Sequence, residues 1–63
     1  MKNINFEVGY NQGYCWIAYE GGSLYHLKQE VRYRGIPYKS ISFVAFKQGC
    51  EDASKGLPNK YPS

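Results

Sequence analysis

The sequence predicts an α+β fold in which a three-stranded antiparallel β-meander carries one C-terminal α-helix packed on one face. Three observations predict it. Apolar and polar residues alternate over residues 3–10, and aromatic and β-branched residues fill 14–19 and much of 24–34, which is typical of strands. From Phe43 to Leu57, apolar residues recur at spacings of three and four, the period of a helix. With 63 residues, residues 1–63 are expected to form a single domain with one small core.

Residues 3–10 form the first expected strand, because apolar side chains occupy every second position there. Residues 14–19 read YCWIAY and form the second, since apolar residues on both faces suit the central strand of a small sheet. The connections fall at residues 11–13 and at Gly21–Gly22, where glycine accommodates a tight turn. The inner face of the sheet is expected to hold Ile4, Phe6, Val8, Ile17, Leu27 and Val31.

Residues 24–34 allow more than one interpretation. A strand would place Tyr25, Leu27, Val31 and Tyr33 on the inner face, and His26, Lys28, Glu30, Arg32 and Arg34 on the outer face. A helix would begin after Ser23 as N-cap and would present a thin apolar stripe of Leu24, Leu27 and Val31. The segment could also divide into a short helical turn and a strand from Glu30 onward. The strand pattern matches more positions, so the expected fold has a third strand here.

Residues 41–55 form the expected helix. Ser40 or Ser42 can cap its first turn, Gly56 suits the left-handed position after its last turn, and Pro58 prevents its continuation. Its apolar stripe is expected to face the sheet, and its polar side, which includes Asp52, is expected to face solvent. Residues 57–63 then form a loose tail.

A flank of small residues runs beside the apolar stripe of this helix and consists of Ser42, Ala45, Gly49, Ala53 and Gly56. Small side chains allow another backbone to approach closely, and a glycine in mid-helix costs about 0.5–1 kcal/mol relative to alanine. A packing role for the flank is therefore expected. We expect it to pack onto the sheet, and the alternative is a helix–helix interface that would make a homodimer or a larger oligomer.

Composition and motifs exclude several function classes. The formal net charge is +3, and the second half carries the basic excess, which permits an acidic partner such as nucleic acid. Cys15, Cys50 and His26 lack the spacing of a zinc site, and neither cysteine stands in a catalytic motif. The chain is therefore expected to be no enzyme and to need no metal or cofactor. Without a signal-peptide pattern or an apolar run of membrane-spanning length, a cytoplasmic setting is expected.

The outer face of the expected sheet is the candidate binding surface. Lys28, Arg32 and Arg34 would line it beside His26, and the neighbouring strand would add Tyr14 and Trp16. Tyr33 and Tyr38 are further candidate anchors. Basic groups among exposed aromatic rings suit single-stranded nucleic acid, and they also suit a protein interface, where Trp, Tyr and Arg contribute most of the binding energy. The alternative is that these rings form the core.

Three resemblances bear on function. The run AFKQGCEDASKG (residues 45–56), followed by Pro62, resembles a helix of ribosome modulation factor and other short bacterial and phage proteins, and implies a helical chain that binds ribosomal RNA. The expected order of strands and helix, with Lys28, Arg32 and Arg34, is similar to the small DNA-binding modules of phage integrases and AP2-type domains, which lay a sheet in the major groove. The small, Tyr-rich format resembles accessory proteins of phages and mobile elements, including anti-CRISPR inhibitors.

The leading hypothesis is a non-enzymatic binding protein of phage or mobile-element type. It would inhibit or modify a host nucleic-acid-handling complex, and its partner would be a host protein or ribonucleoprotein rather than a membrane. One alternative is direct binding of DNA or RNA through the basic and aromatic sheet face. Another is a small structural protein that oligomerises through the flank of small residues.

Overall fold

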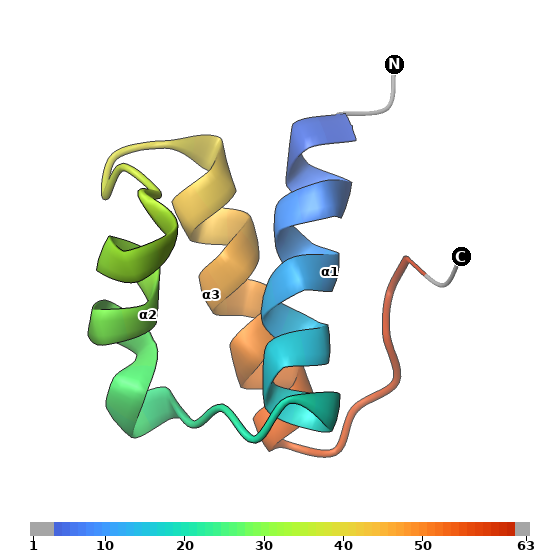
Figure 1. Cartoon of the computed structure of the whole chain (residues 1–63). Coiled ribbons are helices and arrows are strands. Elements are labelled where there is room, and N and C mark those ends of the chain that lie inside the picture. The colour runs from blue at the N-terminus through green and yellow to red at the C-terminus, as the bar shows by residue number, and fades with distance from the viewer. Residues whose placement is uncertain (1–3, 62–63) are drawn as a thin grey trace.

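The computed structural model describes residues 4–61, and side chains from residue 5 onward. This part of the chain is helical and contains no strand. Helix α1 spans Ile4–Tyr19, the short 3-10 helix η1 spans Leu24–His26, α2 spans Leu27–Arg34 and α3 spans Ile41–Ser54. Helices α1 and α3 run in the same direction, and α2, which lies between them in the sequence, runs in the opposite direction (Figure 1). The expected α+β fold is therefore wrong, and the described residues form a small bundle of three α-helices.

All three expected strands are replaced by helix. Residues 4–10 and 14–19 belong to the single helix α1, and the expected turn at 11–13 lies inside it; residues 24–34 form η1 and α2. The first residue of the expected strand 3–10 and the end of the expected tail 57–63, with Pro62, lie outside the described residues. In α1 the buried residues are Gly9, Tyr10, Gly13 and Trp16, whose spacings of one, three and three are helical.

Helices α1 and α3 approach each other backbone to backbone. A Cβ atom added at Gly13 would overlap the carbonyl oxygen of Phe46, and one added at Gly49 would overlap the carbonyl oxygen of Tyr10. A Cβ atom on Gly9 would lie 3.1 Å from that of Ala45. This packing explains why a helix forms although each internal glycine costs about 1 kcal/mol of helix propensity. The part of the flank formed by Ser42, Ala45 and Gly49 thus packs against α1 of the same chain and not against a sheet, whereas Gly56 is exposed beyond the end of α3.

The core lies where the three helices meet. Its buried members are Trp16, Val31, Phe46 and Cys50, with partly buried apolar side chains around them from Ile17, Leu27, Ile36 and Phe43. The rings of Trp16 and Phe46 lie 5.8 Å apart between centroids, a separation at which aromatic pairs attract each other. Gly22 follows α1 and leaves room for the Trp16 ring, which a Cβ atom there would overlap. The Gly21–Gly22 pair therefore serves the end of a helix and not a hairpin.

The boundaries of α3 confirm the prediction from the sequence. Ser40 caps the helix, because its hydroxyl oxygen accepts a hydrogen bond from the backbone N–H of Phe43 at 3.1 Å. Gly56 ends it in the left-handed conformation with φ of 74°, and the N–H of Leu57 then donates to the carbonyl of Asp52 at 2.9 Å. No helix in residues 4–61 is long and apolar enough to cross a membrane.

Candidate functional site

Helix α2 has one buried and one exposed side. Leu27 and Val31 point into the core, whereas residues 28, 29, 32 and 33 are exposed, as expected for positions one turn apart on the opposite side. Tyr25 in η1 lies one turn before them. Tyr25 and Tyr33 are 91% and 86% exposed. We call this surface the α2 face, and it consists of Tyr25, Lys28, Gln29, Arg32 and Tyr33.

The α2 face carries positive charge without negative charge. Neither Lys28 nor Arg32 forms an ion pair with any other described residue. The one acidic residue of α2, Glu30, is turned away from the face and accepts a hydrogen bond from Nε of Arg34 at 2.6 Å. The charges of Lys28 and Arg32 are therefore available to an anionic partner.

Arg34, expected in the same binding set, lies elsewhere. Its guanidinium carbon is 5.2 Å from the centroid of the buried Phe46 ring, and it also contacts Glu20 at 3.9 Å. In a strand, residues 32 and 34 would share a face, but in a helix they are about 200° apart. Arg34 therefore belongs to the packing of α2 against the core, and its expected place beside Arg32 is corrected.

The expected aromatic partners from residues 14–19 are also displaced. Trp16 is only 8% exposed and belongs to the core. Tyr14 is half-buried and donates its hydroxyl hydrogen to the carbonyl oxygen of Leu57 at 2.5 Å. Tyr38 is half-exposed in the connection between α2 and α3, where its ring lies 5.2 Å from that of Phe43. These three residues do not join the α2 face.

His26 lies at the edge of the α2 face. Its Nδ1 atom is 2.9 Å from the hydroxyl oxygen of Ser23, and its ring meets that of Tyr25 edge to face at 5.1 Å. Of the eight expected binding residues, the structure brings together Lys28, Arg32 and Tyr33, with His26 beside them. The strand interpretation places Tyr25 and Tyr33 on the inner face of the sheet, although Tyr33 is also a candidate anchor. The helical interpretation of residues 24–34 would have placed both outside, through the spacing of 25, 28, 29, 32 and 33.

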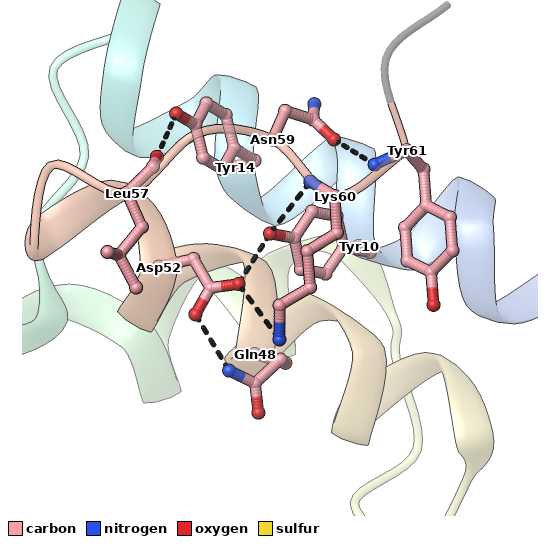
Figure 2. Close-up of polar contacts among 8 residues, drawn as sticks. All are labelled: Tyr10, Tyr14, Gln48, Asp52, Leu57, Asn59, Lys60 and Tyr61. Atoms are coloured by element: carbon pink, nitrogen blue, oxygen red, sulfur yellow. Dashed lines mark hydrogen bonds and ion pairs between the residues drawn. The ribbon is translucent and has the colours of Figure 1, made fainter.

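A second polar cluster surrounds Asp52, which is 2% exposed although the sequence predicts it in solvent. The hydroxyl of Tyr10 donates to its carboxylate at 2.5 Å, and Nε2 of Gln48 donates at 2.8 Å. Nζ of Lys60 lies 3.5 Å from the same carboxylate (Figure 2). The pKa of Asp52 is lowered, chiefly by the hydrogen bond from Tyr10, although burial alone would raise it. The pKa of Tyr10 is raised to about 12, mainly by burial and secondly by the hydrogen bond to Asp52.

This cluster holds the C-terminal segment against α1. The backbone N–H of Lys60 donates to the hydroxyl oxygen of Tyr10 at 3.3 Å, and Nδ2 of Asn59 donates to Oδ1 of Asn11 at 2.7 Å. The ring of Tyr61 meets that of Tyr10 edge to face at 5.2 Å. Figures 1 and 2 show the segment running back along α1. Because three side chains already occupy the carboxylate, Asp52 acts as a structural anchor for residues 57–61.

Two other kinds of chemistry-bearing residue, the thiols and the possible metal ligands, form no site within residues 4–61. Cys50 is buried in the core, and burial raises the pKa of its thiol to about 12, which keeps it protonated and unreactive. Within residues 4–61, no group of three or more His, Cys, Asp and Glu side chains could hold a metal ion. The α2 face is therefore the candidate site. Comparisons with protein-family models, with curated proteins and with solved structures find no match for this chain.

Proposed function

We propose that this chain is a non-enzymatic nucleic-acid-binding protein that makes contact through the α2 face. The observation that carries the proposal is the exposure of Lys28 and Arg32, which form no ion pair with the described residues, on the α2 face together with Tyr25 and Tyr33. Cationic side chains bind phosphates by releasing condensed counterions, and exposed rings stack on bases. The two kinds of contact together are typical of surfaces that bind nucleic acid.

The resemblance of residues 45–56 to ribosome modulation factor supports the same proposal. That family is helical throughout, and the expected strands were the main departure of this chain from it. Because residues 4–61 contain helices and no strand, this departure is gone. We include in the proposal a cytoplasmic setting, where RNA is accessible and two free cysteines remain reduced.

Binding of fluorescently labelled RNA, followed by anisotropy over a series of salt concentrations, tests the proposal. Replacing Lys28 and Arg32 together with alanine should weaken binding and flatten its salt dependence, because the slope of log K against log salt is about −0.7 for each phosphate contact on a single strand. Two lost contacts should change that slope by about 1.4.

The matched control replaces Lys47 and Lys55 with alanine. Both side chains are exposed, and the control removes the same charge from a different part of the surface. An equal loss of affinity in the control would show that net charge, and not the α2 face, governs binding. Absence of binding by the unaltered protein at low salt would refute the proposal.

A second candidate function is the inhibition of a host nucleic-acid-handling complex through a protein contact, as anti-CRISPR proteins do. It is favoured by a groove of about 360 Å³ between Tyr38, Phe43 and Val44, bordered by Lys47, Gln48 and Glu51. Tyr38 and Val44, which line the groove, are 50% and 58% exposed, and exposed apolar patches are typical of contact sites. Capture of a host complex after nuclease treatment, lost with Val44→Asp but retained with the Lys28 and Arg32 variant, would support this function over the first.

A further inference from the structure

We infer that the α2 face binds unpaired nucleotides in preference to duplex. This inference rests on the proposed function and adds the class of nucleic acid. It depends on where the two tyrosine rings lie and on how few cations accompany them.

The rings of Tyr25 and Tyr33 need bases with free faces. Both residues are almost fully exposed, at 91% and 86%, so their rings are open to solvent, and the ring of Tyr25 also meets that of His26 edge to face. Tyr25 and Tyr33 lie eight residues apart in sequence, one in η1 and the other in the last turn of α2. In a duplex, bases are stacked at about 3.4 Å and offer only their edges in the grooves. In a single strand or a loop, bases can be splayed apart and stacked on separate rings.

The charge on the α2 face is small for a duplex-binding surface. It has two cations, Lys28 and Arg32, whereas the duplex-binding proteins with strong salt dependence make about six to ten phosphate contacts. With so few phosphate contacts, stacking must supply much of the affinity, and stacking is available to unpaired bases. Gln29 lies between the cations and can both donate to and accept from the edge of an exposed base.

The test compares a labelled 12-nucleotide single-stranded RNA with a 12-base-pair RNA duplex, by anisotropy at one salt concentration. We expect the single strand to bind at least tenfold more tightly. Tyr25→Ala and Tyr33→Ala should each weaken single-strand binding by roughly 5- to 140-fold, the range that corresponds to the loss of one stacked base. The corresponding Phe variants should retain it, because they keep the ring.

The matched control is Tyr19→Ala, which removes a ring that is 79% exposed but belongs to α1. It should leave binding unchanged. Equal or tighter binding to duplex would overturn this inference and leave the proposed function standing, and so would Tyr25 and Tyr33 variants that bind the single strand like the unaltered protein. Absence of binding to both RNAs would refute the proposed function itself.

Discussion

Replacing Gly13 with alanine tests the contact that organises the bundle. On helix propensity alone, this change inside α1 should stabilise the protein by about 1 kcal/mol. The structure predicts the opposite sign. The added Cβ atom would overlap the carbonyl oxygen of Phe46 and would lie 3.1 Å from its Cα atom. Because these are backbone atoms, no rotamer change can relieve the overlap, and the two helices must separate.

The magnitude follows from two opposing contributions. Overpacking a well-packed interior costs typically 1–3 kcal/mol, and a rigid backbone neighbour places Gly13→Ala near the upper end. After subtraction of the gain of about 1 kcal/mol in propensity, the free energy of unfolding should fall by about 2 kcal/mol. For a domain of this size, each 1 kcal/mol shifts Tm by about 4–8 °C. Tm should therefore fall by about 8–16 °C.

Thermal and urea unfolding followed by circular dichroism measure this change. Gln12→Ala is the matched control, because Gln12 is exposed on the same helix and surface substitutions usually stay within about 0.5 kcal/mol. Gly49→Ala should destabilise as strongly as Gly13→Ala, since its Cβ would overlap the carbonyl oxygen of Tyr10. A Gly13→Ala variant more stable than the unaltered protein would show that α1 and α3 are not in backbone contact here.

Three further predictions concern the tail and the thiols. Because folding lowers the pKa of Asp52, its carboxylate should stabilise the protein fully above about pH 4, and this stabilisation should decline as the pH falls further. Urea unfolding at several pH values measures this decline, and Asp52→Asn should reduce it. Tyr14→Phe removes the hydroxyl that donates to the C-terminal segment and should cost about 0.5–1.5 kcal/mol in the same assay. Native protein should react with thiol reagents at Cys15 before the buried Cys50, as peptide mass spectrometry would show; faster labelling of Cys50 would contradict its burial.

Helix α3 could be predicted from the sequence because its signals are local. An apolar stripe, a serine cap and a terminal glycine all lie within the segment itself. Helix α1 could not, because it is rich in Asn, Tyr and Gly, which are poor helix formers. Its buried side includes Gly9 and Gly13, which carry no hydrophobic signal. These glycines matter because they let α1 approach the small residues of α3, such as Ala45 and Gly49. The signal for α1 therefore depends on the match between two segments that are distant in sequence.

The candidate site was predicted in part, for a similar reason. Lys28, Arg32 and Tyr33 were singled out by residue type, which does not depend on the fold. Which of their neighbours share a surface does depend on it. The period of two in a strand would place Tyr25 on the buried side and Arg34 on the exposed side. The helical period instead leaves Tyr25 exposed and turns Arg34 toward the core. Asp52 was misplaced because its burial depends on Tyr10 and Lys60, which come from other parts of the chain.

The opposite orientations of Arg32 and Arg34 decide which variants can report on function. Arg34 forms an ion pair with Glu30 and contacts the Phe46 ring. Its replacement would therefore disturb the packing of α2 against the core and lower binding for a structural reason. Arg32 has no such contact with the described residues, and its removal leaves the buried side of α2 intact. The position of α2 is fixed from that side by Leu27 and Val31. The α2 face can therefore be altered without unfolding the bundle, and this separation makes a loss of binding there interpretable.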